Sequence, residues 1–506
     1  MRSFLVFVVV GILGFLVGCG GSSTPAGVPV TITLNPTSAS IHAGQSVNIV
    51  ATVGNDSSGK GVTWTLSGVS GGGDSLTSVT PTSATYNAPA KVTSNSVATV
   101  TATSAASSGV SASLQITVLP AGVANNIQPI AVDGGPVAGS IYPNGAFTSV
   151  TICVPGSNNC QTIDGILVDT GSFGLRVLAS AITIPLNPLT DSSGTQQLND
   201  CVKFADQSFL FGTVDQADIV MAGELAGQSS TSFTTLQSIA NPTSYSIPVD
   251  CSTGGNNEDN QTALGANGIL GVGPAAVDCG FVCDPASGGS PPGPAYYFCS
   301  AASGCAAAFV PCGNACGGTL PNAQITNPVF NFPVDNNGVI LELPAVAGVA
   351  ATVNGNMVFG IGTQSNNHLG AAKVFTMDSQ FNFTTTLTGK APVPGFIDSG
   401  SNGLFFLDAT TTGFPLCTDP SWYCPASTTP LSATQTGTNS VSNAVNFSVD
   451  NKDTVTTGNP GDAAFSNLAG PFSGSFDWGL PFFYGRSVFT AIDGTNVGTP
   501  GPFWAY

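Results

Sequence analysis

The stretch ILVDTGSFGLRVL, residues 166–178, recurs in altered form as GFIDSGSNGLFFL at residues 395–407. Both copies place apolar residues before an Asp-(Thr/Ser)-Gly-Ser loop and share a later Gly and two Leu at the same offsets. A chance match with such flanks is rare, so the pair indicates an internal repeat. The sequence therefore predicts two related lobes, each carrying one Asp loop.

Each loop places a carboxylate at the end of an apolar strand, with a glycine and a hydroxyl beside it. A pseudo-two-fold axis between the lobes would bring Asp169 and Asp398 to about 3 Å, where two carboxylates cannot both ionise easily and share a proton. One group then acts as an acid and the other as a base. A separation beyond about 6 Å would exclude that chemistry.

Composition narrows the class of protein further. The 506 residues carry 27 acidic and only nine basic residues, a net charge of −18, which excludes tracking a nucleic-acid backbone. With 63 Gly and 35 Pro, the chain favours short strands joined by turns, an all-β fold. The two histidines, His42 and His368, supply neither a Ser-His triad nor a zinc site, so we expect no metal and no cofactor.

The N-terminus has the pattern of an export signal. Arg2 precedes an apolar run at 4–17 that is too short to span a bilayer permanently. The run ends in Leu-Val-Gly-Cys19, which resembles the bacterial lipobox, although a plain signal peptide with an incidental Cys is the alternative. We expect a signal peptide at 1–18, lipid on Cys19, a tether at 19–28 and anchoring in the cell envelope, at the outer membrane.

The other twelve cysteines form an even set, as in an exported protein with disulfides. Two pairs close short polar loops, and we predict the bridges Cys153–Cys160 and Cys417–Cys424. Zinc binding is the alternative, but the spacings do not fit it. The remaining cysteines cluster as Cys279/Cys283, Cys299/Cys305 and Cys312/Cys316, with Cys201 and Cys251 left over.

Residues 29–119 contain no cysteine and read as a β-sandwich. Strand-like runs recur about every ten residues, at 30–34, 46–53, 61–66, 83–86, 98–102 and 113–118. Val62-Thr63-Trp64 is expected to be a central strand with a core aromatic. The region resembles a bacterial Ig-like (Big) domain, a module that commonly serves as a spacer or adhesive unit. A linker at 120–128 follows.

The rest of the chain resembles the pepsin-like aspartic endopeptidases, in a divergent bacterial form. Beyond the two Asp loops, the resemblance rests on five further segments, at 211–223, 267–273, 327–332, 356–362 and 476–498. They look like the strand after the flap, the segment beneath the first Asp loop, the crossing between the lobes, the strand that enters the second lobe and the closing hairpin. The resemblance implies a bilobal pepsin-like β-fold, with lobes at 129–325 and 326–506.

The resemblance also implies roles for the loop residues. Asp169 and Asp398 would hold the attacking water between them. Their neighbours would support this dyad: Ser172 and Ser401 as donors to the carboxylates, Thr170 and Ser399 through crossed hydrogen bonds, and Gly171 and Gly400 as the tight turns.

The expected flap departs from the family pattern. Relatives carry a flap Tyr and, seven residues after the first Asp, a Trp that bonds it. Here Arg176 stands in the Trp position and Phe204 in the Tyr position. Either the flap is rebuilt, with Arg176 facing Asp206, or the cleft no longer closes on peptides. A surface Arg is the alternative for Arg176.

Two functions of different class follow. The first is a monomeric, lipid-anchored aspartic endopeptidase that cuts polypeptides, and the retained Asp, Gly and Ser of both loops favour it. The second is a non-catalytic surface module that binds a ligand and keeps the pepsin-like fold. The altered flap and the Ig-like region favour the second.

Overall fold

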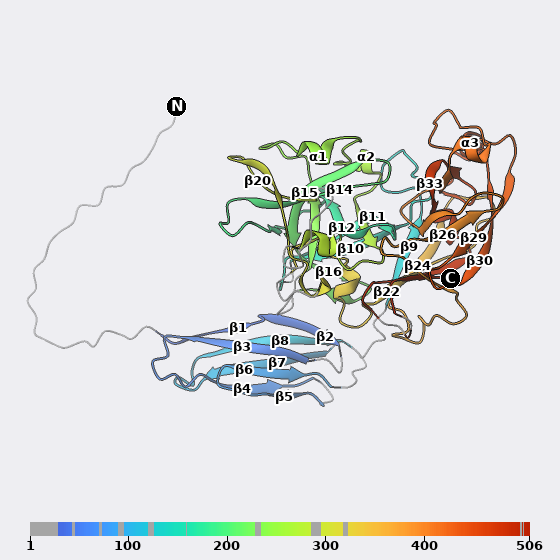
Figure 1. Ribbon diagram of the computed structural model, residues 1–506. Helices are drawn as coiled ribbons and strands as arrows, with labels where there is room; N and C mark the ends of the chain where they lie inside the picture. Colours follow the sequence, from blue (N-terminus) through green and yellow to red (C-terminus); the bar gives the residue numbers. More distant parts are fainter. Residues whose placement is uncertain are drawn as a thin grey trace, which may run out of the picture. The chain divides into compact units, whose positions relative to one another are not determined.

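The computed structural model describes residues 29–42, 46–69, 73–89, 96–119, 126–157, 159–227, 234–284, 295–316, 322–495, 498 and 500–506. The chain divides into two compact units, Met1–Gly122 and Val123–Tyr506. Both are built from strands, shown as arrows in Figure 1, and the helices α1–α4 have only four to seven residues each. The predicted all-β fold class is confirmed.

The export signal falls outside this description. The signal peptide at 1–18, Cys19 and the tether at 19–28 are not among the described residues, so lipidation stays a prediction. In the part of the chain that is described, no helix has the length and apolar character needed to cross a membrane.

The first unit is a sandwich of two four-stranded sheets, with orders β1-β3-β6-β5 and β2-β8-β7-β4. Side chains from both sheets, such as Ile49 and Leu114, meet in one buried core. All six predicted strands are present, and β2 and β5 are additional. The strands are β1 (Thr31–Asn35), β2 (Ser38–His42), β3 (Ser46–Gly54), β4 (Val62–Ser67), β5 (Ser75–Thr77), β6 (Ser83–Asn87), β7 (Ser96–Ser104) and β8 (Ser111–Leu119).

The central strand predicted around Trp64 is wrong. β4 is the last strand of its sheet and pairs only with β7 among the described strands. Trp64 is half-buried, and its indole N–H donates to the Thr80 carbonyl at 2.9 Å. Tyr86 of β6 is the fully buried aromatic instead, and its hydroxyl donates to Asp74 at 3.0 Å.

In the second unit, the larger sheet closes on itself as a barrel. Its strands are β9 (Ile127–Val132), β10 (Phe147–Cys153), β11 (Cys160–Asp169), β12 (Phe173–Leu178), β13 (Asn187–Pro188), β14 (Gln197–Lys203), β15 (Phe209–Gln216), β16 (Asp218–Met221), β17 (Glu224–Ala226), β18 (Thr235–Ile239), β19 (Gly268–Val272), β20 (Tyr296–Ser300), β21 (Gly304–Ala308), β22 (Gly338–Leu343), β24 (Val353–Phe359), β25 (Val374–Thr376), β34 (Arg486–Ala491) and β35 (Phe503–Ala505). Because β22, β24, β25, β34 and β35 belong to it, residues from both predicted lobes share this sheet.

A seven-stranded sheet completes the second unit, with order β30-β29-β26-β27-β33-β28-β32. β26, β29 and β30 lie side by side at its outer end in Figure 1. Its strands are β26 (Phe383–Leu387), β27 (Val393–Ile397), β28 (Leu404–Leu407), β29 (Thr429–Thr436), β30 (Ser442–Val449), β32 (Ala469–Gly470) and β33 (Phe472–Trp478). The short elements are β23 (Val349–Ala350), β31 (Ala464–Phe465), α1 (Val249–Ser252), α2 (Gln261–Leu264), α3 (Ala409–Thr412) and α4 (Lys452–Gly458).

The two Asp loops sit on the same three-stranded arrangement. In the first copy, β19 lies between β11 and β12, parallel to one and antiparallel to the other. In the second copy, β33 lies in the same way between β27 and β28. The internal repeat predicted from the sequence is therefore a repeat of local topology.

Buried side chains beneath the loops fix their position. Leu270 of β19 pairs with Val168 on one side and Leu175 on the other, and all three are fully buried. Trp478 of β33 has the matching place beside Ile397, and both are also fully buried. These residues belong to one hydrophobic core, so the strands beneath both loops pack in the same core.

Both predicted disulfides, Cys153–Cys160 and Cys417–Cys424, are present. The first joins the facing ends of β10 and β11. The other bridges are Cys201–Cys251, Cys279–Cys283, Cys299–Cys305 and Cys312–Cys316. The cysteines that cluster in the sequence are thus bonded within their clusters.

Candidate active site

The two aspartates face each other across their loops. Asp169 ends β11, and Asp398 directly follows β27. A Cβ at Gly171 would stand 2.5 Å from the carboxyl carbon of Asp398, and a Cβ at Gly400 would stand 2.7 Å from that of Asp169. Each glycine therefore leaves the space that the carboxyl of the other loop occupies.

Crossed hydrogen bonds lock the loops together. The Thr170 N–H donates to Ser399 Oγ at 3.1 Å, and the Ser399 N–H donates to Thr170 Oγ1 at 3.0 Å. The two hydroxyls then donate to strand carbonyls of the opposite lobe, Ile397 O at 3.1 Å and Val168 O at 2.7 Å. Thr170 and Ser399 are fully buried, so no water competes for these bonds.

Each carboxylate accepts one backbone N–H and one hydroxyl from its own loop. The Gly171 N–H donates to Asp169 Oδ1 at 2.8 Å, and the Ser172 hydroxyl donates to Asp169 Oδ2. The second loop has the equivalent pair of donors. The Gly400 N–H donates to Asp398 Oδ1 at 2.8 Å, and the Ser401 hydroxyl donates to Asp398 Oδ2 at 2.7 Å. The structure thus brings together every residue that the sequence assigned to the two loops.

Asp169 holds a proton more tightly than an ordinary aspartate. Burial of Asp169 raises its pKa well above the ordinary value, and the charge of Asp398 and a hydrogen bond between the two carboxyls raise it further. Ser172 and Gly171 act in the opposite direction, because they donate to the charged form. The raised pKa of Asp169 means that this carboxyl keeps its proton at a higher pH than an isolated aspartate does.

The flap candidates lie on the hairpin of β14 and β15. Phe204 begins its turn and packs against a buried cluster that includes Leu178 and Leu210. Asp206 accepts hydrogen bonds from the N–H and the hydroxyl of Ser208, at 2.9 and 2.7 Å. The predicted pairing of Asp206 with Arg176 does not occur.

Arg176 lies instead in a buried ionic cluster, and it is not on the surface. It is 1% exposed, and its Nη2 lies 3.1 Å from Asp200 and 2.9 Å from Asp278. Asp278 also accepts from the Tyr296 hydroxyl at 2.5 Å. Strand register explains the difference from the prediction, because β12 places Arg176 inside its lobe and the turn that carries Asp206 lies beyond the end of β14.

Replacing Arg176 by Leu should destabilise the second unit by about 3–5 kcal/mol, since it leaves Asp200 and Asp278 buried without a cation. Urea unfolding followed by tryptophan fluorescence measures this loss. The matched control is Lys452→Met, which removes a cation 3.6 Å from Asp453 at the surface and should change stability by less than about 1 kcal/mol. Equal effects of the two substitutions would contradict the buried cluster.

Comparison with known proteins identifies the family of this region. Residues 122–506 match the family described as "Protein of unknown function (DUF3443)". The chain belongs to the DUF3443 family. No curated protein matches the chain.

Two solved structures of titin Ig domains are similar to part of the chain. "I-band fragment I67-I69 from titin" has 16% identity and a TM-score of 0.15, and the "3Ig structure of titin domains I67-I69 E-to-A mutated variant" has 13% and 0.14. Each match covers 42% of this chain and 66% of the titin chain, just under two thirds of its length.

Within the DUF3443 region, Asp477 is a site residue that the sequence reasoning missed. It lies on β33, is 5% exposed, and its Oδ2 lies 2.6 Å from Ser401 Oγ. The equivalent residue on β19 is Ile269. It pairs with Leu167, two residues before the first Asp, just as Asp477 pairs with Phe396, two residues before the second. Comparing the third strand of each repeat, rather than the Asp loops alone, would have revealed this extra carboxyl.

Tyr142 also lies close to the dyad of the DUF3443 region without a sequence signal, and Glu258 lies close to Tyr142. Burial raises the pKa of the Tyr142 hydroxyl, and the charges of Glu258, Asp169 and Asp398 raise it further. Burial and the charge of Asp206 raise the pKa of Glu258 to about 7. Tyr142 comes from the segment before β10, which carries no recognisable motif.

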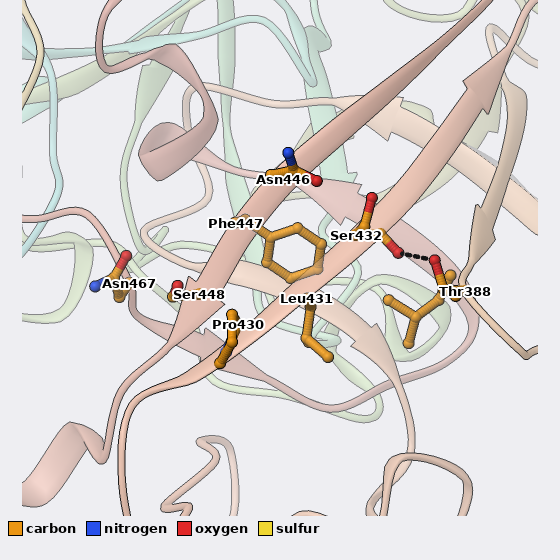
Figure 2. Close-up of a pocket in the computed structure, with 9 residues that line it drawn as sticks. Thr388, Pro430, Leu431, Ser432, Asn446, Phe447, Ser448 and Asn467 are labelled. Carbon is orange, nitrogen blue, oxygen red and sulfur yellow. Dashed lines mark hydrogen bonds between the residues drawn. The ribbon is translucent and has the colours of Figure 1, made fainter.

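A surface hollow in the DUF3443 region lies apart from the Asp loops. Figure 2 shows its side chains on and beside β29 and β30, with the Thr388 hydroxyl donating to the Ser432 carbonyl at 2.8 Å. It is lined by Leu387, Thr388, Pro430, Leu431, Ser432, Asn446, Phe447, Ser448 and Asn467. None of these side chains is titratable, so the hollow offers no acid–base chemistry.

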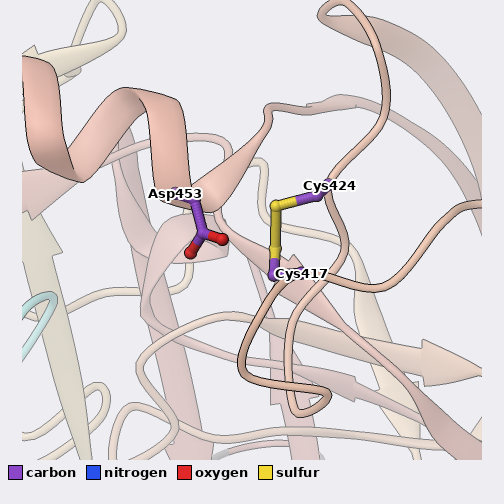
Figure 3. A group of neighbouring side chains, drawn as sticks. All are labelled: Cys417, Cys424 and Asp453. Carbon is purple, nitrogen blue, oxygen red and sulfur yellow. A yellow bond between two sulfur atoms is a disulfide. The ribbon is translucent and has the colours of Figure 1, made fainter.

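One group of side chains in the DUF3443 region has ligand atoms close enough together for a metal ion, but two of these atoms are the sulfurs of a disulfide. Figure 3 shows Cys417, Cys424 and Asp453, whose ligand atoms lie within 4.8 Å of one another. Both sulfurs are bonded in the disulfide, and a cysteine binds metal as a free thiolate. The group is therefore a disulfide beside a carboxylate.

Buried carboxyls should make the second unit more stable in mild acid than at neutral pH. Asp169, Asp200, Asp278 and Asp477 all have raised pKa values, chiefly through burial. At a pH between the ordinary pKa of an aspartate and the raised pKa of the folded state, the folded chain binds more protons than the unfolded chain. The free energy of unfolding therefore falls as the pH rises through this range. We expect a higher melting temperature at pH 5 than at pH 8, measured by tryptophan fluorescence. A melting temperature that increases from pH 5 to pH 8 would contradict the raised pKa values of these aspartates.

Proposed function

We propose that the second unit is a pepsin-like aspartic endopeptidase that hydrolyses peptide bonds with Asp169 and Asp398. The observation that carries this proposal is the placement of each carboxyl over the glycine of the opposite loop. Such an arrangement supplies a general acid and a general base to one bound molecule. The repeated topology of β11–β19–β12 and β27–β33–β28 supports the assignment, since it supplies the two-fold relation that a dyad needs.

The proposed reaction uses one water molecule and the shared proton. The ionised carboxyl takes a proton from the water as its oxygen attacks the carbonyl carbon of the substrate. The protonated carboxyl gives its proton to the carbonyl oxygen, which becomes a hydroxyl of the tetrahedral intermediate. The carboxyl that took the water proton then gives it to the leaving nitrogen, while the other carboxylate takes back a proton from a hydroxyl of the intermediate. The C–N bond breaks, a carboxylic acid and an amine are released, and the pair again holds one proton.

Rigidity of the loops supports this role. The crossed bonds of Thr170 and Ser399 hold both carboxyls in place before substrate binds. Positioned groups of this kind contribute by reducing the reorganisation that the reaction needs. A loop that served only as a turn would have no need of four hydrogen bonds to the opposite lobe.

The surroundings support slow rather than fast turnover. Phe204 packs into a cluster at the flap, where relatives carry a Tyr, and Arg176 is committed to its buried carboxylates. Closure of a flap excludes water and positions the substrate. The chain would act on extended polypeptides from the cell envelope, to which Cys19 would attach it through lipid.

The function is tested with the mature chain, purified without residues 1–19 and incubated with denatured protein substrate from pH 3 to pH 7. We expect acid-favoured cleavage that a pepstatin-like statine inhibits, because the pair works only while one carboxyl is protonated. A folded protein that cleaves nothing across this range would overturn the proposal. It would favour the non-catalytic surface module that binds a ligand.

A further inference from the structure

Ser401 stands between two carboxyl groups in the second Asp loop. Its Oγ lies 2.7 Å from Asp398 Oδ2 and 2.6 Å from Asp477 Oδ2. Both distances are those of good O–H···O hydrogen bonds. Asp477 is thereby linked to the dyad through a single hydroxyl.

Proton counting restricts the charge of this group. A serine hydroxyl carries one hydrogen and donates one hydrogen bond. Two ionised carboxylates have no hydrogen to donate, so Ser401 could satisfy only one of its two close contacts. The other contact becomes a hydrogen bond only if Asp398 or Asp477 carries a proton.

The surroundings of Asp477 favour the neutral form on this residue. It is 5% exposed, and its Oδ1 is buried without a hydrogen-bond partner. Its cross-strand neighbours are Phe396 and Phe405, both apolar. Among the described residues, no Lys or Arg lies within ion-pair distance of it. An ionised carboxylate with an unpaired oxygen in such a place is costly.

We propose that Asp477 is a positioning residue that keeps its proton at neutral pH and donates it to Ser401 Oγ. Ser401 then donates its own hydrogen to Asp398 Oδ2. This inference rests on the proposed function for its effect on catalysis, but the protonation of Asp477 is a property of the folded chain. Burial and the charges of Asp398 and Asp169, the two charged groups that act on Asp477, raise its pKa well above the ordinary value.

The first lobe has no counterpart of this third acid. The matching residue is Ile269, and the Ser172 hydroxyl has its hydrogen bond with Asp169. The two halves of the dyad are therefore unequal. A donor behind Ser401 strengthens the hydrogen bond that Asp398 accepts, which assigns the negative charge of the pair to Asp398 and the shared proton to Asp169.

Infrared spectroscopy tests the protonation directly. At pH 7 the mature chain should show the carbonyl stretch of a protonated carboxyl, and Asp477→Asn should remove one such band. The control is Asp164→Asn, which changes an exposed aspartate and should remove none. If the Asp477→Asn difference spectrum shows only a lost carboxylate, Asp477 is ionised and the proposal is overturned.

The pH dependence of cleavage tests the positioning role through its sign. Asp477→Leu removes the donor, so the acid limb of the profile should move up by roughly one pH unit, because Asp398 loses support for its charge. Asp477→Asn keeps an N–H donor toward Ser401 and should restore the limb. If Asp477 were an anion, both substitutions would move the limb down, since each removes a negative charge near the dyad.

The two proposals fail separately in these experiments. If the wild-type chain cleaves no substrate, the proposed endopeptidase activity is rejected. The carbonyl band that Asp477→Asn should remove still decides whether Asp477 is protonated. A cleaving chain whose band is absent keeps the endopeptidase and rejects the role of Asp477. If Asp477→Leu does not fold, the Asp477→Asn spectrum decides the proposal.

Discussion

Replacing Asp169 or Asp398 by Asn should lower peptide cleavage by about 10²–10⁴-fold or more, the range expected when a general acid or base is lost. An amide cannot take a proton from water at these pH values, so either change leaves the pair without its proton exchange. Volume and packing hardly change. The measurement is kcat/KM on a denatured protein substrate at the pH of greatest activity.

Stability of the same variants separates a chemical effect from misfolding. Asn at position 169 replaces a carboxyl that burial disfavours in its charged form, so the melting temperature should stay equal or rise. The matched control is Asp164→Asn, the same change at an exposed position, which should leave cleavage unaltered. Cleavage that survives both dyad substitutions would come from another site or another protein, and it would end the assignment.

The sequence predicts the two Asp loops well because their pattern is local and repeated. Strand, Asp, Gly and Ser lie within a few residues, and the second copy removes most of the ambiguity of the first. The crossed bonds of Thr170 and Ser399 follow once a two-fold relation between the lobes is accepted. Short strands such as β5 escape prediction because three residues carry too little alternation to be recognised.

Long-range pairing is where sequence reasoning fails. Arg176 has two carboxylate partners, Asp200 and Asp278, and the second lies 102 residues away. Nothing in the local sequence distinguishes these two aspartates from Asp206, which the flap segment offers as the nearest expected partner. Asp477 was overlooked for a related reason. Its importance depends on Ser401, 76 residues away, and on the apolar strands around it.

Replacing Gly171 or Gly400 by Ala should lower cleavage by on the order of 10²-fold or more, although neither residue takes part in proton transfer. The added Cβ at Gly171 would lie 2.5 Å from the carboxyl carbon of Asp398, and that at Gly400 would lie 2.6 Å from Asp169 Oδ1. Carbon atoms do not approach so closely, so the carboxyls must move apart. A displacement of about 1 Å at a catalytic group costs on the order of 10²-fold in rate.

The two loops cannot shift without breaking hydrogen bonds, so the loss of cleavage should be large. Thr170 and Ser399, next to the two glycines, are each held by bonds to the opposite lobe, so a shift of one loop strains the other. We expect a stability loss of about 1–3 kcal/mol from the overpacking. Gly461→Ala is the matched control, because a Cβ there meets no atom within 4 Å, and it should change stability by less than about 0.5 kcal/mol. If Gly171→Ala cleaved as fast as Gly461→Ala, the carboxyl of Asp398 would not lie over the first loop, and the dyad would lose the geometry on which the proposed reaction depends.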